Sequence, residues 1–212
     1  MSNGGAHKNI TSAFSVRGHE ALEAQYEEWA GTYDADNAAM GFRLPILAAA
    51  FFARWVPVDN AQILDAGCGT GLAAENLWIL GYRNLVGIDL SEAMLAKAQE
   101  LGVFSQLHRM VMGDALEFDD GAFAGAIVTG VFTEGHAPHS SFDELVRVVR
   151  PGGHIVFNVR DDIYEHQGFR EKMDELEAKR FWALAEKSDP FRPYTIGEEH
   201  VSARIFAYRV ER

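Results

Sequence analysis

The stretch "ILDAGCGTG", residues 63–71, decides the fold, because a short apolar run is followed by three glycines at alternate positions. Glycine lacks a β-carbon, so this spacing predicts a turn whose backbone passes very close to another group. The helical pattern "ENLWIL" comes after the turn. A glycine-rich turn that leads from a strand into a helix presents backbone N–H groups and a partial positive charge. We therefore expect it to bind a carboxylate or a pyrophosphate.

Short apolar runs alternate with helical segments through the rest of the chain. The runs are "AQILDAG", "NLVGIDL", "LHRMVMGD", "AGAIVTG" and "HIVFNV". Each has about the length of a buried strand, and this alternation predicts a parallel sheet covered by helices on both faces. At the end of the chain, "RFWALAEKS" and the alternating "RIFAYRV" predict a last strand that returns antiparallel. The fold class is therefore a doubly wound α/β sheet of five parallel strands and a terminal hairpin.

Three segments are expected along the 212 residues. Residues 1–17 are polar and without period, which predicts a disordered tail. Residues 18–57 contain an aromatic stripe at helical spacing, formed by Tyr26, Trp29 and Tyr33, and are interpreted as an N-terminal helical lid. Residues 58–212 form the sheet domain, and 48% apolar residues are enough for one full core.

Composition limits the partners and the compartment. The net charge of −12 is unfavourable for a phosphate backbone, so no nucleic-acid partner is expected. No apolar window approaches the roughly 20 residues that span a bilayer, so no membrane contact is expected. Cys68 is the only cysteine, and no charged-then-apolar leader is visible, so we expect a cytoplasmic protein without an internal disulfide. Monomer and homodimer both stay open.

Acidic residues end three of the predicted strands, namely Asp65, Asp89 and Asp114. Asp89 lies about 20 residues beyond the glycine turn, where a ribose presents its hydroxyls to a carboxylate in adenosine-binding sheets. The loop "GCGTG" lacks the G-x-G-x-x-G spacing of dinucleotide sites. Asp65 would repel a pyrophosphate but attract an ammonium and a sulfonium. The sequence therefore favours S-adenosylmethionine over a nicotinamide dinucleotide.

These motifs resemble class I S-adenosylmethionine-dependent methyltransferases, through "LDAGCGTG", "GIDLSEAML", "GDA" and "RVVRPGG". "YEEWAGTYDADNAAMGFRLP" and "GVFTEGHAP" look like the methyltransferase-like proteins of the Williams-Beuren syndrome region. The resemblance implies a Rossmann-like seven-stranded sheet in the order 3-2-1-4-5-7-6, with strand 7 antiparallel. It also implies S-adenosylmethionine as the cofactor. The residues expected around this cofactor are Tyr33, Asp65, Gly67, Cys68, Gly69, Thr70, Asp89, Leu90, Gly113, Asp114, Ala115, Thr129 and Gly130. Cys68 is interpreted as small buried filler of the loop, and Met94 is left open between adenine contact and core.

Acceptor residues are expected on two loops. His136 in "TEGHAPHS" is the candidate catalytic base, and the alternative is a loop histidine without a role, since alignment alone can supply much of the barrier reduction. Phe132 begins the same loop segment, "FTEGHAP". The segment "DPFRPYTIGEEHVSA" offers Arg192 as an anchor for an anionic group and Tyr194 as an apolar wall. No metal site is expected.

The sequence thus indicates a methyltransferase that acts on an oxygen, nitrogen or sulfur atom of a small molecule by in-line transfer. The fourth predicted strand ends in "TGVFTEG" rather than Asn-Pro-Pro-Tyr, which argues against methylation of bases or glutamine. Two alternatives stay open: a module that binds S-adenosylmethionine without catalysis, and a methyltransferase of protein side chains. The identity of the acceptor cannot be read from the sequence, because fold does not fix function.

Overall fold

The computed structural model describes residues 4–15 and 18–212. Its helices are α1 (Gly4–Ser15), α2 (His19–Trp29), α3 (Tyr33–Ala39), α4 (Leu44–Trp55), α5 (Leu72–Ile79), α6 (Glu92–Leu101), α7 (Ser141–Val148), α8 (Asp161–His166) and α9 (Phe169–Ala178). Its strands are β1 (Ile63–Ala66), β2 (Leu85–Asp89), β3 (Phe104–Arg109), β4 (Phe123–Phe132), β5 (Val149–Arg160), β6 (Trp182–Lys187) and β7 (Ala203–Val210).

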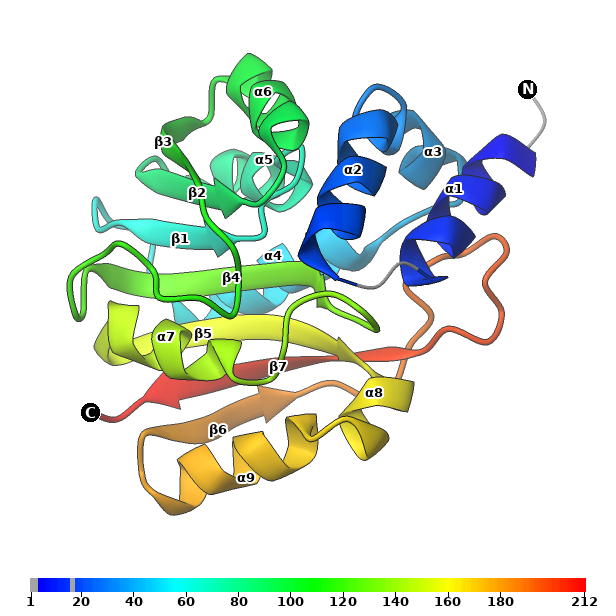
Figure 1. The fold of residues 1–212 in the computed structure, drawn as a ribbon. Helices are drawn as coiled ribbons and strands as arrows, with labels where there is room; N and C mark the ends of the chain where they lie inside the picture. The colour runs from blue at the N-terminus through cyan, green and yellow to red at the C-terminus, as the bar shows by residue number, and fades with distance from the viewer. Residues whose placement is uncertain (1–3, 16–17) are drawn as a thin grey trace.

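The strands form one sheet in the order β3-β2-β1-β4-β5-β7-β6. The first five strands pair in parallel, whereas β7 pairs antiparallel with both β5 and β6. The predicted fold class, strand order and antiparallel last strand are therefore confirmed. Strand order reverses between β1 and β4, so a crevice opens at their carboxyl ends, which is where ligands bind in sheets of this kind. Figure 1 shows these ends on the right, beneath α2 and α3.

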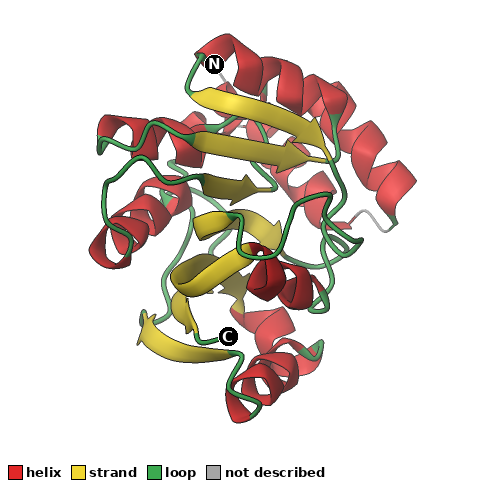
Figure 2. Ribbon diagram, turned by 90° about the vertical axis from the view of Figure 1, so that its left-hand side faces the viewer, coloured by secondary structure: helices red, strands yellow, loops and turns green. Residues whose placement is uncertain are grey.

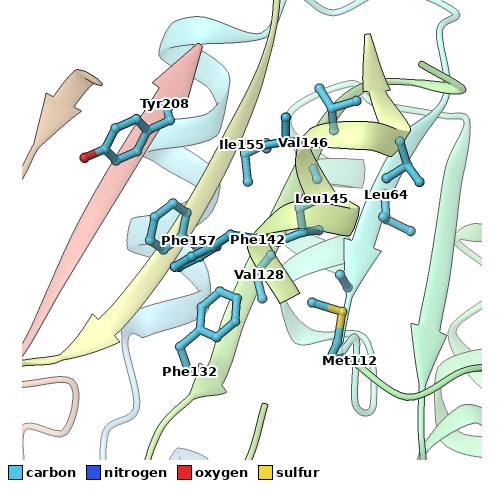
Figure 3. Close-up of a cluster of buried hydrophobic side chains, with 14 of the residues drawn as sticks. Leu64, Met112, Val128, Phe132, Phe142, Leu145, Val146, Ile155, Phe157 and Tyr208 are labelled. Carbon is cyan, nitrogen blue, oxygen red and sulfur yellow. The ribbon is translucent and has the colours of Figure 1, made fainter. Parts of the chain in front are cut away.

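Helices cover both faces of the sheet (Figure 2), as the alternation of runs predicts. On one face, α7 and α9 bury aromatic and branched side chains against the strands, among them Phe142 and Phe157, whose ring centroids lie 4.8 Å apart. Figure 3 shows this cluster. On the other face, α4 and α5 bury Phe52 and Leu77. The two packed layers hold the sheet in place, and the carboxyl ends of its strands carry the site.

The structure differs from the sequence analysis at the N-terminus, where a disordered tail is expected. Residues 4–15 form α1, and residues 1–3 and 16–17 lie outside the described residues. Ala6 and Ile10 are buried one turn apart and pack with Trp29, Met40 and Tyr194. These partners come from distant segments of the chain. Helix α1 therefore gains its stability from tertiary packing rather than from its own short apolar pattern.

The expected lid separates into two parts. Helix α4 packs on the sheet through Ala48 and Phe52 and so belongs to the core layer. Helices α2 and α3 instead lie over the carboxyl ends of the strands, beside α1 and the loop of residues 188–202, which joins β6 to β7 (Figure 1). Within the described residues, no helix is long and apolar enough to cross a membrane.

Candidate functional site

Two adjoining pockets lie at the carboxyl ends of the strands. The first pocket is lined by His19, Leu22, Tyr26, Tyr33, Gly67, Gly69, Asp89, Leu90, Met94, Met110, Val111, Met112, Thr129, Gly130, Val131, His136 and Ala137. The second pocket is lined by Ile10, Tyr26, Trp29, Tyr33, Phe42, Leu44, Gly130, Thr133, Asn158, Arg160, Pro193, Tyr194, Val201 and Ala203. Tyr26, Tyr33 and Gly130 line both, so these residues mark the junction between the two pockets.

The glycine turn forms one wall of the first pocket. Gly67 and Gly69 have φ angles of 74° and 54°, which only glycine adopts without strain. A β-carbon on Gly67 would collide with the side chain of Val131, whereas one on Gly69 would meet no atom within 4 Å. The turn is tied to β2, because the backbone N–H groups of Gly67 and Cys68 both donate to the carbonyl of Ile88. Gly69 therefore leaves space that a ligand can fill.

Asp89 ends β2 at the floor of the first pocket. Its Oδ2 accepts a hydrogen bond from the Gly69 N–H at 2.8 Å, and its Oδ1 accepts one from the Ser91 N–H at 3.0 Å. Burial raises the pKa of this carboxyl, and the N–H groups of Ser91 and Gly69 act in the opposite direction. The Asp89 carboxylate is thus held in a fixed orientation beside the glycine turn.

Asp65, at the end of β1, is fully buried beneath the turn. Neither of its carboxylate oxygens has a hydrogen-bond partner of normal geometry among the described residues. Burial and then the charge of Asp89 raise the pKa of Asp65 to about 7, with the Ala74 N–H opposing the rise. An unpartnered buried carboxylate is costly, so the pair Asp65 and Asp89 makes this end of the first pocket suited to a cation. The same two carboxylates, after burial itself, raise the pKa of the Cys68 thiol, which stays protonated.

The opposite end of the first pocket is apolar and differs from the expectation. Strand β3 ends at Arg109, so Met110, Val111 and Met112 form the wall there. Three further expected residues, Gly113, Asp114 and Ala115, are exposed and do not line the pocket. The Asp114 N–H donates back to the Val111 carbonyl, so the chain turns away from the pocket at this point.

Leu90, Met94, Thr129 and Gly130 all line the first pocket. The expected residues Asp65, Cys68 and Thr70 instead lie buried around the glycine turn, behind the lining.

Helix α2 contacts the loop after β4 through a tyrosine and a histidine. The Tyr26 Oη lies 2.9 Å from His136 Nε2, and His136 Nδ1 lies 3.0 Å from the Glu134 carbonyl oxygen. A carbonyl oxygen only accepts, so Nδ1 carries the hydrogen, and in the neutral imidazole Nε2 accepts from the Tyr26 hydroxyl. Burial raises the pKa of Tyr26, which keeps the hydroxyl protonated. Tyr26 and His136 therefore form a hydrogen-bonded pair at the junction.

Two further contacts hold α2 and α3 over the strand ends. The buried Thr70 hydroxyl donates to Asp34 Oδ1 at 2.6 Å, which joins the glycine turn to α3. Glu27 Oε1 accepts from the Ser91 hydroxyl at 2.9 Å and from the Ala93 N–H at 3.0 Å, which joins α2 to the start of α6. The two helices are thus fastened to the elements that surround the first pocket.

The expected acceptor residues are placed differently from one another. Tyr194 lines the second pocket and stacks on Phe42 at 4.8 Å. Phe132 is fully buried in the core, 4.8 Å from the ring of Phe142, and lines neither pocket (Figure 3). Arg192 also lies outside both pockets, and its Nη2 donates to the Gly197 carbonyl at 2.9 Å. This hydrogen bond directs the Arg192 guanidinium toward the backbone of its own loop, which explains why Arg192 does not line a pocket.

Asn158 and Arg160 are pocket residues that the sequence analysis missed. They occupy alternate positions at the carboxyl end of β5, so both face the second pocket. A polar residue followed two positions later by a cation at the end of an otherwise apolar strand was the available signal. The sequence analysis did not use this signal, because the predicted strand "HIVFNV" stops one residue before Arg160 and leaves it in "RDD".

Comparisons with known proteins fit this geometry. Residues 64–157 match the family of methyltransferase domains. The chain is 32% identical over 163 residues to methyltransferase-like protein 27 of Homo sapiens, covering 74% of this chain and 66% of that protein. It is 31% identical over 138 residues to demethylmenaquinone methyltransferase of Clavibacter sepedonicus, covering 64% of this chain and 56% of that enzyme. The chain thus spans about half to two thirds of the length of these relatives.

Solved structures share the fold at low sequence identity. The [4+2]-cyclase SpnF superposes with a TM-score of 0.69 at 14% identity, covering 92% of this chain and 97% of that one. Geranyl diphosphate C-methyltransferase of Streptomyces coelicolor, solved with Mg²⁺, geranyl diphosphate and S-adenosylhomocysteine, superposes with a TM-score of 0.60 at 17% identity. That alignment covers 94% of this chain and 87% of the enzyme. At such identities the likeness concerns the fold alone.

Proposed function

Because this chain belongs to the class I S-adenosylmethionine-dependent methyltransferases, we propose that it transfers a methyl group to an oxygen, nitrogen or sulfur atom of a small molecule. The single observation that carries the proposal is the pair of adjoining pockets that share Tyr26, Tyr33 and Gly130. A group-transfer enzyme needs two ligands in contact, and a junction of this kind brings a donor and an acceptor together.

The residues of the first pocket fit S-adenosylmethionine. Behind the lining, the unpartnered oxygens of Asp65 favour a cationic group at this end of the pocket, and the open space at Gly69 admits a ligand against the backbone. Asp89 is a fixed carboxylate that can accept hydrogen bonds from ribose hydroxyls. The apolar wall of Met110, Val111 and Met112 suits an adenine ring. These residues would hold the cofactor.

The chain contributes alignment and the exclusion of water. When bound, S-adenosylmethionine supplies a methyl carbon to which the acceptor's lone pair forms a bond while the carbon–sulfur bond breaks, the electron pair staying on sulfur in S-adenosylhomocysteine. Tyr26 and Tyr33 cover the junction from the lid side, and Gly130 borders it from β4. A β-carbon on Gly130 would meet no atom within 4 Å, so glycine keeps the passage between the pockets open. Closing the site replaces water with fixed protein groups around the reacting atoms.

For an acceptor that must lose a proton, Tyr26 and His136 provide a route. The Tyr26 oxygen takes the acceptor's proton while the Tyr26 hydroxyl proton moves to His136 Nε2, which already lies 2.9 Å away. In this proposal His136 acts through Tyr26. An acceptor that is already deprotonated needs alignment only.

Several features support a small molecule over a macromolecule. The second pocket is roofed by Ile10 of α1 and Trp29 of α2, so an acceptor has to fit beneath two helices. The net charge of −12 is unfavourable for a nucleic-acid backbone. A non-catalytic binding module would need the first pocket but not the second, whereas methylation of a protein side chain would require α1 and α2 to open.

Turnover tests the proposal directly. The purified protein is incubated with S-adenosylmethionine and fractionated metabolite extract, and S-adenosylhomocysteine is quantified. We expect extract-dependent formation that is lost in Asp89→Ala and kept in Asp119→Ala, an exposed acid near the amino end of β4. With the acceptor in hand, His136→Asn should lower kcat by a larger factor than it weakens S-adenosylhomocysteine binding, because His136 also lines the first pocket. Cofactor binding without turnover of any fraction would favour the binding module.

A further inference from the structure

We propose that the second pocket recognises an apolar carboxylic acid with a planar body, whose carboxylate lies against Asn158 and Arg160. The inference rests on the proposed function, since it names the class of the methyl acceptor. It depends on the charge, the donors and the walls of this pocket.

Among the described residues, Arg160 is the only charged side chain that lines the second pocket. Its side chain is 15% exposed, and its Nη1 donates to the Thr133 hydroxyl at 3.3 Å. Its Nε and Nη2 contact the carboxylate of Asp162 at 3.1 and 2.5 Å. Asp162 is 51% exposed and does not line the pocket, so water screens its charge more than that of Arg160. The positive partner of this ion pair therefore lines the pocket, and the negative partner lies outside the lining.

The charge of Arg160 acts inside the pocket as well as at its edge. Burial and Tyr33 raise the pKa of Tyr194, and Arg160 is the group that opposes the rise. Glu198 adds to the rise, but it lies outside the pocket lining and contacts His7 at 3.1 Å.

Asn158 supplies a hydrogen-bond donor of fixed orientation. Its side chain is buried, and its Oδ1 accepts a hydrogen bond from the Gly130 N–H at 2.8 Å. This bond identifies the oxygen, so the amide NH₂ is the group left to serve the pocket. Within the described residues that NH₂ makes no hydrogen bond. This donor is directed to the pocket, and a carboxylate oxygen is an acceptor that it can serve.

The other walls suit a flat apolar body. Phe42 and Tyr194 stack at 4.8 Å, and Trp29 and Tyr33 meet edge to face at 4.6 Å. The polar ends of two of these rings are already engaged, because Trp29 Nε1 donates to Asp36 at 2.8 Å and the Tyr194 hydroxyl donates to Asn37 at 3.2 Å. These walls therefore offer mainly apolar ring surface to a ligand, and aromatic rings favour planar partners.

The two pockets are also complementary in charge. Asp89 lines the first pocket with Asp65 buried behind it, which suits a cationic cofactor, whereas the charged residue that lines the second pocket is Arg160. A cation and an anion bound on either side of Gly130 attract each other in a site with little water. This arrangement favours an anionic acceptor over a neutral or cationic one of the same shape.

A matched ligand series tests the class. Protein saturated with S-adenosylhomocysteine is titrated by calorimetry with 3-phenylpropionate, 3-phenylpropionamide and 3-phenylpropylamine, which share one body and differ in the head group. We expect the carboxylate to bind at least tenfold more tightly than the amide, and the amine to bind most weakly. Equal affinities, a preference for the amine, or absence of carboxylate binding would overturn the inference while leaving the proposed function in place.

Variants assign the preference to the pocket. Arg160→Gln should bring the affinities for carboxylate and amide within twofold of each other, and Arg160→Lys should restore the preference. Arg204→Gln is the control. Arg204 lies on the neighbouring strand β7, contacts Asp161 at 2.7 Å and does not line the pocket. S-Adenosylhomocysteine affinity should be the same in all variants. A preference that survives Arg160→Gln contradicts the assignment, and the ligand series on the unaltered protein decides the class even if this variant does not fold. Failure of the unaltered protein to bind S-adenosylhomocysteine would instead overturn the proposed function.

Discussion

At the scale of single residues, Asp65 is a carboxylate whose burial is unfavourable for the stability of the fold. Its carboxylate is buried beneath the glycine turn without a hydrogen-bond partner of normal geometry among the described residues, and it lies near Asp89. An apolar core would not retain such a group, because an unpartnered buried carboxylate destabilises the fold. Its retention makes sense if a cationic ligand offsets the cost, which is the role that the proposed function gives to this end of the first pocket.

A pH dependence of stability follows from Asp65. Its folded pKa of about 7 lies above an unfolded value of about 4, so the native state holds a proton that the unfolded chain has lost between these values. The stability from this proton is complete below about pH 4 and is lost as the pH rises to about 7. Asp65→Asn mimics the protonated form, so the ligand-free variant should exceed the unaltered protein at pH 8 by up to about 4 kcal/mol in free energy of unfolding.

Urea unfolding of both proteins at pH 5 and pH 8 measures this effect. The gain should be clearly smaller at pH 5, where Asp65 is already protonated in the native state. The same variant should bind S-adenosylhomocysteine more weakly at pH 8, because it lacks the charge that meets the cation. A gain of equal size at both pH values would show that Asp65 titrates normally.

Part of the predicted site lines the first pocket and part does not. Asp89 and Gly69 line the first pocket as their motifs indicate, because their positions are fixed by strand ends and by a turn. Phe132, by contrast, is the last residue of β4, and the sequence could not show whether its ring points into the core or the pocket. Arg192 and Asp114 are displaced by local hydrogen bonds of their own loops, which no periodicity reveals.

At the scale of elements, three separate segments meet above the strand ends. The loop after β4 contacts α2 through His136 and Tyr26, and the β6–β7 loop contacts the turn after α3 through Tyr194 and Phe42. The sequence analysis expected acceptor residues on both loops and interpreted residues 18–57 as a lid. It did not predict α1, because Ala6 and Ile10 become a buried face only against partners far away in sequence.

The arrangement predicts that α2 and α3 respond to cofactor and α4 does not. Helices α2 and α3 are fastened by a few polar contacts, such as Asp34 with Thr70, and should open to admit ligand. Helix α4 is packed on the sheet and serves as the internal control. Hydrogen exchange with and without S-adenosylhomocysteine should show protection gained in α2 and α3 alone.

A variant sharpens this test of the lid. Asp34→Ala removes the acceptor of the Thr70 hydroxyl, and a loss of about 1 kcal/mol in closure corresponds to about fivefold weaker S-adenosylhomocysteine binding. Protection of α2 and α3 that is already complete without ligand would mean that these helices are a permanent part of the core.

At the scale of the whole molecule, the alternation of strands and helices predicted the layered sheet, and the family resemblance supplied the strand order that the structure confirms. The glycine turn after β1 contributes to the alternation and to the resemblance. It lies where strand order reverses, and this fixes the position of the first pocket. The second pocket could not be predicted in this way. Its walls come from α1, α2, β5 and the β6–β7 loop, and only the folded chain brings them together.

The central claim is that the first pocket is an S-adenosylmethionine site built around the acids at the strand ends. Calorimetric titration with S-adenosylhomocysteine and with NAD⁺ tests it most directly. The account predicts one S-adenosylhomocysteine bound per chain, no heat with NAD⁺, and a loss of roughly 1.5–3 kcal/mol in Asp89→Ala from the missing charged acceptor. Tight binding of NAD⁺, or an unchanged S-adenosylhomocysteine affinity in Asp89→Ala, would contradict it.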